Sequence, residues 1–203
     1  YRPSRMAIVA VGDFDAAAIE KQIIDTFSAV AARGPARPSP ALGNTYDFTG
    51  VRTLFHHEPE AGATTVAIQT ASPLPAEPDT AATRVARVPR DLAVAILNRR
   101  LDILSKQEGA PFTRGHAGVN DAFDLFRNAL IELTCKPTQW PEALAVADQE
   151  LRRALEHGFQ PAELAEVRAN MINALEQAAR TAATRRSDQL AGELISALTQ
   201  DEV

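Results

Sequence analysis

The side chains most suited to metal chemistry in this chain of 203 residues are its four histidines, His56, His57, His116 and His157. Imidazoles and carboxylates bind zinc, and the run His56-His57-Glu58-Pro59-Glu60 has suitable residue types. This run ends a strand-like pattern, in which neighbouring side chains point to opposite faces. Pro59 also excludes a helix that could bring two imidazoles to one side. We therefore expect a polar strand terminus here and no metal site.

The other residues that could ligate or attack lack partners in the sequence. His116 and His157 have no Cys, His or Glu at ligand spacing, so we expect surface or cap positions. His157 precedes Gly158, where a cation would suit the end of a helix. The single cysteine, Cys135, excludes an internal disulfide and a cysteine zinc site. It ends the strand pattern 129–135, which predicts a small buried side chain.

Paired carboxylates offer a different chemistry, that of an independent enzyme. Asp121 and Asp124 lie three residues apart in one predicted strand or its turn. A regular strand directs residues at that spacing to opposite faces. No paired nucleophile or glycine-rich phosphate loop accompanies them, so nothing further in the sequence supports this alternative.

Composition excludes several classes of partner. The chain is 45% hydrophobic, which is enough for a sizeable core, and its net charge is −5. Nucleic acids and acidic membranes require a basic face. The densest positive run indicates a solvated helix face; it comprises Arg84, Arg87, Arg90, Arg99 and Arg100. No stretch approaches the roughly 20 apolar residues of a membrane span, so we expect neither a nucleic-acid partner nor a span.

Apolar periodicity predicts an α+β fold, with a mainly antiparallel sheet covered on one face by helices. A strand at 5–12 and a helix at 15–31 precede a linker rich in Gly and Pro. Four further strands are predicted, at 51–58, 64–71, 113–124 and 127–136. A long helix reaching about residue 107, bent at Pro89, follows the second of these. Three helices follow the last strand, around 140–157, around 164–175 and at about 185–198.

Two motifs, in this order, resemble the pitrilysin/insulinase family of zinc metallopeptidases. Tyr1-Arg2-Pro3-Ser4-Arg5-Met6 runs into an apolar strand and Gly12-Asp13-Phe14-Asp15, and Gly158-Phe159-Gln160-Pro161-Ala162-Glu163-Leu164 steps between two helices. The resemblance implies a metallopeptidase-type α/β roll, LuxS/mitochondrial-processing-peptidase-like, present in several copies per enzyme. Residues 1–31 would close the preceding copy, 32–50 would be a linker and 51–203 a non-catalytic domain. We therefore expect a piece of a longer protein.

The zinc motif of that family is missing from this chain. Its members carry H-x-x-E-H on a helix, where two imidazoles bind Zn²⁺ and the Glu activates water. No two histidines here have that spacing. The resemblance thus implies zinc in the catalytic domain of the parent protein, no cofactor or catalytic residue in this chain, and no activity of the chain alone.

A second functional pair of the family is also altered. Some non-catalytic copies hold an Arg and, seven residues later, a Tyr that help to bind substrate; the matching positions here are Ser105 and Phe112. Neither residue supplies the hydrogen bonds of that pair. Lys106 could substitute in part for the Arg. Phe112, Lys106 and the edge of the 113–124 strand, where an extended peptide could pair, are our candidates for substrate binding.

The predicted function follows from the resemblance. The chain would line a closed chamber and support the zinc-bearing lobe, with the catalytic domain of the same parent chain and a peptide or unfolded protein as partners. An alternative is a scaffold or assembly protein that keeps the fold without proteolysis. A periplasmic and a cytoplasmic bacterial parent both fit, and the sequence does not decide between them.

Overall fold

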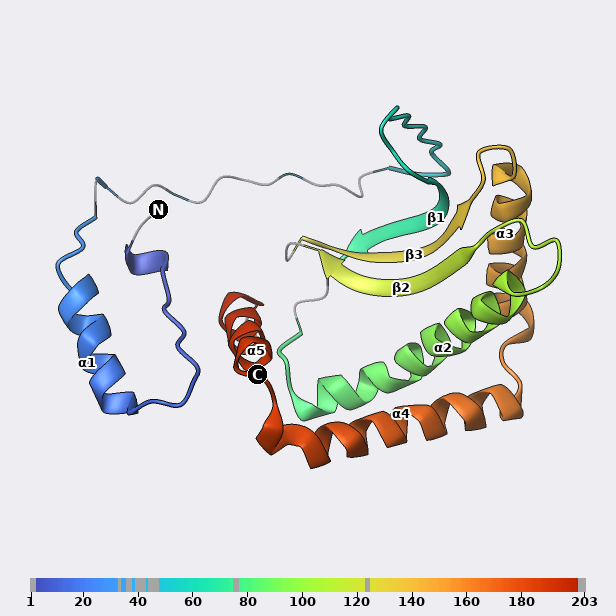
Figure 1. The fold of residues 1–203 in the computed structure, drawn as a ribbon. Coiled ribbons are helices and arrows are strands. Elements are labelled where there is room, and N and C mark those ends of the chain that lie inside the picture. The colour runs from blue at the N-terminus through green and yellow to red at the C-terminus, as the bar shows by residue number, and fades with distance from the viewer. Residues whose placement is uncertain are drawn as a thin grey trace. The chain divides into compact units, whose positions relative to one another are not determined.

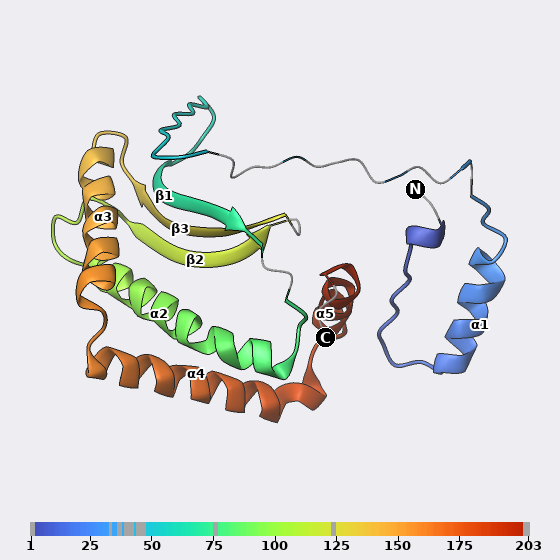
Figure 2. The same ribbon diagram turned by 180° about the vertical axis from the view of Figure 1, so that it is seen from behind.

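The computed structural model describes residues 3–32, 34–35, 38, 43, 48–74, 77–122 and 125–200. The chain divides into two compact units, which we describe separately. The first comprises Tyr1–Ala41, Pro78–Thr80 and Glu176–Val203, and the second comprises Leu42–Glu77 and Ala81–Leu175. Figures 1 and 2 show the elements of both from opposite sides.

A three-stranded antiparallel sheet forms the centre of the second unit, in the order β1-β3-β2. Its strands are β1 (Thr64–Pro73), β2 (Arg114–Ala122) and β3 (Phe126–Cys135). In the register, Ile131 of β3 lies opposite Ile68 of β1 and Ala117 of β2. The strands predicted at 64–71, 113–124 and 127–136 are confirmed within the described residues, and so is the α+β class.

Two helices cover one face of this sheet (Figures 1 and 2). Helix α2 (Ala81–Ser105) packs against β2, and helix α3 (Trp140–His157) packs against β1 and β3. Alternate residues of the strands point toward the helices and exclude water. The buried core cluster consists of Leu101, Phe112, Ala117, Ile131, Leu133, Cys135, Ala143 and Ala147.

Gly115 allows α2 to lie close to the sheet. A Cβ atom at this position would be 2.8 Å from Leu133 Cδ2 and 3.0 Å from Leu101 Cβ. Both atoms belong to fully buried side chains that have no room to move. Glycine is therefore needed at this point of β2 for the helix and sheet to touch.

The opposite face of the sheet carries no helix of the described part of the second unit. Gln69, His116 and Glu132 are exposed on it, one from each strand. The sheet thus has the pattern of an antiparallel layer with one buried face and one solvated face.

The remaining helices agree closely with the predicted periodicity. Helix α2 continues through Pro89, and α3 ends at Gly158, whose φ of 67° suits glycine. Helix α4 (Pro161–Thr181) begins with a proline and lies beside α2 in both ribbon views. The short 3₁₀ helix η2 (Ala182–Thr184) precedes α5 (Ser187–Gln200).

The first unit contains the 3₁₀ helix η1 (Pro3–Arg5) and helix α1 (Ala16–Phe27), besides α5. Asp15 caps α1 by accepting a hydrogen bond from the Ala18 backbone N–H at 2.9 Å. Helix α1 buries none of its residues. The strand predicted at 5–12 is wrong for this structure, because residues 6–12 are irregular and have no ladder partner in the described chain.

The strand predicted at 51–58 is also wrong. These residues are irregular, and the exposed fractions of Val51, Leu54 and Phe55 are 95%, 95% and 88%. A strand is held by hydrogen bonds to a neighbour, and no described strand pairs with this segment. Much of the predicted linker, 32–50, lies outside the described residues.

Candidate functional site

The histidines do not form a metal site in the part of the chain that the structure describes. His56 and His57 lie in the irregular segment before β1, whereas His116 is exposed on β2. No group of three or more His, Cys, Asp or Glu among the described residues could hold a metal ion. The complete sequence also lacks H-x-x-E-H. The described residues therefore do not provide the ligands that the hydrolytic zinc ion of pitrilysin/insulinase-type peptidases requires.

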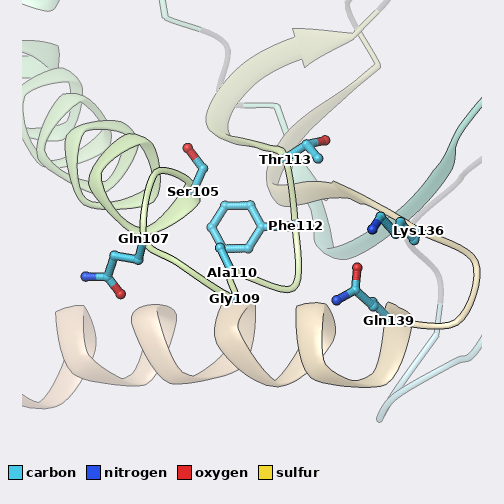
Figure 3. A pocket seen from close by; sticks show the side chains of 8 residues that line it. All are labelled: Ser105, Gln107, Gly109, Ala110, Phe112, Thr113, Lys136 and Gln139. Carbon is cyan, nitrogen blue, oxygen red and sulfur yellow. The ribbon is translucent and has the colours of Figure 1, made fainter.

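An open pocket of about 520 Å³ lies where α2 ends and the chain turns back to β2 (Figure 3). Gly109, with a φ of 76°, makes this turn possible. The pocket is lined by Ser105, Gln107, Gly109, Ala110, Phe112, Thr113, Lys136 and Gln139. It thus brings together Ser105 and Phe112, the two positions matched to the substrate-binding pair.

These two side chains are already engaged in local structure. The Ser105 hydroxyl donates a hydrogen bond to the Asp102 carbonyl oxygen at 2.9 Å. Phe112 is only 3% exposed and belongs to the core cluster. Its ring therefore packs mainly against the core and forms part of the pocket wall. Lys106 does not line the pocket, and its Nζ donates to Asp102 Oδ2 at 2.8 Å.

Sequence reasoning missed three polar residues of this pocket. Gln107 comes from the turn after α2, whereas Lys136 and Gln139 come from the connection between β3 and α3. Lys136 and Gln139 are distant from Ser105 along the chain, and Gln107, although only two residues after Ser105, was given no role by any motif. The lining offers amide, hydroxyl and ammonium groups but no carboxylate and no nucleophile with a base. Such a surface can donate hydrogen bonds to a ligand.

The outer edge of β2 is closed at its centre by a side chain of α2. Asn98 Nδ2 donates to the Ala117 carbonyl oxygen at 2.8 Å, and the Ala117 N–H donates to Asn98 Oδ1 at 2.8 Å. One amide side chain thereby replaces the two hydrogen bonds that a neighbouring strand would make. An extended peptide cannot pair with β2 at Ala117 while Asn98 holds this position.

A buried ion-pair cluster joins α2, α3 and the start of α4. Arg100 donates to Glu163 through Nε at 2.6 Å and through a terminal nitrogen at 2.7 Å. The same terminal nitrogen lies 3.2 Å from the Gly158 carbonyl oxygen. The Arg100 guanidinium also lies over the Phe159 ring, 5.0 Å from its centroid. Three residues of the second sequence motif, Gly158, Phe159 and Glu163, therefore contact Arg100.

The position of Arg100 corrects one expectation. We predicted a solvated face for the arginines of α2, but Arg100 is 6% exposed. Its hydrogen bonds to Glu163 raise the pKa of the guanidinium and lower the pKa of Glu163 to about 2. Glu150, also buried, lies 3.9 Å from the other terminal nitrogen. Arg100 is thus a structural cation that is shared by three helices.

The carboxylate of Asp121 on β2 forms an ion pair with Arg127 of the neighbouring strand β3. Arg127 donates to both of its carboxylate oxygens, at 2.8 and 3.0 Å. These hydrogen bonds hold the pKa of Asp121 below its usual value. Asp124 lies outside the described residues. Since Asp121 is committed to Arg127, the geometry adds no support to an enzyme based on paired carboxylates.

Cys135 is buried at the end of β3, as predicted. Burial raises the pKa of its thiol, because desolvation disfavours the thiolate. A nucleophilic cysteine requires the opposite shift. Cys135 therefore acts as a small apolar residue in the core.

These observations define the second unit as an α+β domain with a helix-covered antiparallel sheet and no zinc motif of its own. The family model described as the Peptidase M16 inactive domain matches residues 1–171. The chain belongs to this family. The predicted kinship with pitrilysin/insulinase-type peptidases, as a non-catalytic domain, is thereby confirmed.

Solved structures of proteases share this fold. The periplasmic protease PqqL from Escherichia coli is similar with a TM-score of 0.69 and 19% identity, over 94% of this chain and 21% of that chain. The first half of PqqL gives a TM-score of 0.66 and 18% identity, over 94% and 40% of the two chains. A predicted insulinase family protease from Yersinia pestis gives 0.69 and 19%, over 95% and 41%.

The chain is therefore shorter than the proteins that it resembles. It spans about a fifth of PqqL and about two fifths of the other two structures. No curated protein sequence matches it. Across the described residues, no helix combines the length and apolar character that crossing a membrane demands.

Proposed function

We propose that this chain supplies a non-catalytic wall of the peptide-enclosing chamber in a longer zinc metalloendopeptidase. The zinc-bearing domain would belong to the same parent chain, which this domain supports, and the substrate would be a peptide or an unfolded protein. Membership of an inactive-domain family and the likeness to larger chains described as proteases support this proposal.

The observation that carries the proposal is the one-sided cover of the sheet. Helices α2 and α3 pack on one face, whereas the other face presents exposed polar side chains, among them Gln69, His116 and Glu132. A solvated, rigid sheet face backed by a packed core suits a wall that excludes bulk solvent but does not react. Its amide, imidazole and carboxylate side chains can hydrogen-bond to a peptide.

The domain organisation proposed from the sequence completes this picture. Residues 1–31 would close the preceding repeat, 32–50 would link, and 51–203 would form the non-catalytic domain. The exposed apolar side chains of α1, such as Ile24 and Phe27, support a contact outside this chain for the first segment. Phe112 and Lys106 remain the proposed peptide contacts beside the pocket.

A scaffold or assembly protein is the second candidate. The observation that favours it is the pair of altered positions, because Ser105 and Phe112 both line the pocket without the charge and hydroxyl group of the family pair. A parent that has lost peptidase activity would be free to lose these groups. The same fold would then serve only as a packing surface.

The coding sequence of the parent protein separates the two candidates. The peptidase proposal expects H-x-x-E-H in another domain and peptide cleavage that a chelator abolishes. Absence of that motif throughout the parent would overturn it in favour of the scaffold. In an active parent, Lys106→Gln should raise KM for peptides several-fold and leave unfolding unchanged. Lys21→Gln is the matched control, since both lysines are exposed and pair with an aspartate four residues away.

A further inference from the structure

The pocket at the end of α2 contains polar side chains that the fold leaves unused. Gln107, Lys136 and Gln139 line it, and within the described part of the chain their side chains have no hydrogen-bond or ion-pair partner. By contrast, the hydroxyl groups of Ser105 and Thr113 donate to backbone carbonyl oxygens. The amide groups and the ammonium group are therefore available to a ligand.

The charge of Lys136 distinguishes it from the other lysines. The chain has three lysines, of which Lys21 pairs with Asp25 and Lys106 pairs with Asp102. Across the residues that the structure describes, no carboxylate pairs with Lys136. No carboxylate lines the pocket either. An anion that enters the pocket would supply the missing negative charge through a charge-assisted hydrogen bond.

Lys136 and Gln139 reach the pocket from one short turn between β3 and α3. The Gln139 N–H donates to the Lys136 carbonyl oxygen at 2.9 Å, so the backbone fixes the spacing of the two side chains. In Figure 3 the polar ends of both side chains lie on the side of the Phe112 ring. Since Phe112 belongs to the packed core, the pocket combines two hydrogen-bond donors with a rigid apolar wall.

This pair of donors matches one carboxylate group. The ammonium group of Lys136 neutralises a single negative charge, and the amide of Gln139 can donate to the second carboxylate oxygen. A neutral peptide carbonyl would leave the charge of Lys136 without a counter-ion. A phosphate monoester carries about two negative charges, and Lys136 is the one cationic side chain among the lining residues.

We propose that this pocket binds a carboxylate of a peptide, with Lys136 as the counter-ion, Gln139 as a hydrogen-bond donor and Phe112 as the apolar wall. The volume of about 520 Å³ lies within the range of small-ligand sites and can hold a few peptide residues. The carboxylate belongs either to a free C-terminus or to an Asp or Glu side chain. This inference rests on the proposed function, in which the ligand is a peptide, and it adds the group that is recognised.

Peptide binding to this chain tests the proposal directly, because all of the lining residues belong to it. Trp140 is the single tryptophan, follows Gln139 and is 50% exposed, so its fluorescence can report occupancy. Three peptides share one sequence: an uncharged peptide with a free C-terminus, its C-terminal amide, and that amide with one internal Glu. A carboxylate in at least one position should tighten binding at least tenfold over the uncharged amide. The position that does so identifies the source of the carboxylate.

Equal binding of all three peptides, or no binding of any at millimolar concentration, would overturn the proposal. Lys136→Gln should abolish the tenfold preference, whereas Lys21→Gln removes the same charge from another exposed site and should retain it. Gln139→Ala should weaken carboxylate binding several-fold and leave the uncharged amide unaffected. Thermal unfolding should be the same for all variants, since none of these side chains is buried. Full preference in the Lys136→Gln variant would also refute the assignment.

The outcome is independent of the peptidase activity of the parent protein, since these titrations require neither zinc nor turnover. Carboxylate recognition can fail while the parent still carries H-x-x-E-H and cleaves peptides. It can also succeed in a parent that has no zinc motif, where the same pocket would hold a peptide without cleavage.

Discussion

Arg100 and Glu163 form a two-point ion pair, with nitrogen–oxygen distances of 2.6 and 2.7 Å, between the middle of α2 and the first turn of α4. Glu163 also accepts a hydrogen bond from the Gln160 backbone N–H at 2.8 Å, so it caps its own helix while it binds Arg100. One carboxylate therefore both caps α4 and joins it to α2.

Replacing Glu163 by Gln should destabilise the fold and flatten its response to acid. The pKa of Glu163 is about 2 in the folded chain and near 4.5 in a free side chain. Its stabilisation is therefore complete above about pH 4.5 and is lost as the pH falls toward 2. We expect a loss of about 3 kcal/mol at pH 7, because the buried Arg100 keeps its charge without this partner. Urea unfolding between pH 2 and 7 measures it.

Glu166→Gln is the control for this experiment. Glu166 pairs with Arg99 on the exposed side of the same two helices, and both side chains are nearly half exposed. Screening by water limits such a pair to about 0.5 kcal/mol. Equal losses for the two variants would contradict a special role of the Arg100 cluster.

Asn98→Ala should leave the Ala117 N–H and carbonyl groups without partners at a half-buried strand edge. Losing both hydrogen bonds should cost about 1–3 kcal/mol. Hydrogen exchange should show faster exchange of the Ala117 amide, while the amides of β3 stay protected. Gln69→Ala, which removes an exposed amide from β1 of the same sheet, serves as the control. Unchanged exchange at Ala117 would mean that Asn98 does not close this edge.

Gly115→Ala should be strongly destabilising because its Cβ would lie 2.8 Å from Leu133 and 3.0 Å from Leu101. Forcing these groups apart should cost about 1–3 kcal/mol. At Gly62 an added Cβ meets no atom within 4 Å, so Gly62→Ala should be nearly neutral. Thermal unfolding of both variants checks the difference, and a neutral Gly115→Ala would show that α2 is not in close contact with β2.

Cys135 should react with thiol reagents only when the domain opens. The thiol is buried and its pKa is raised, so both access and thiolate formation oppose reaction. Labelling of the native chain at pH 8 should be at least a hundredfold slower than in urea. Rapid labelling without denaturant would contradict a packed core at the end of β3.

Helices were the most predictable part of this fold, because their apolar spacing and stop signals are local. The stripe of Leu97, Leu101 and Leu104 and the stop at Gly158 lie where the sequence indicates. The strands expected at 5–12 and 51–58 failed, since a strand needs a hydrogen-bonding neighbour that the described chain does not contain.

The site was predictable only in part, for a related reason. Ser105 and Phe112 could be located by their match to a known motif, and they do share a pocket. Lys136 could not, because it joins that pocket from a segment about 30 residues away, through tertiary packing. Arg100 was predicted on a solvated face because helical periodicity does not reveal a partner from another helix. That partner is Glu163 of α4.

The central claim is that this chain has no hydrolytic metal centre of its own. The most direct measurement is zinc binding and peptide cleavage by the purified, metal-stripped chain after zinc is restored. The account predicts no stoichiometric zinc at micromolar concentration and no turnover of unfolded peptides. One tightly bound zinc per chain, with peptide cleavage that a chelator abolishes and zinc restores, would contradict it.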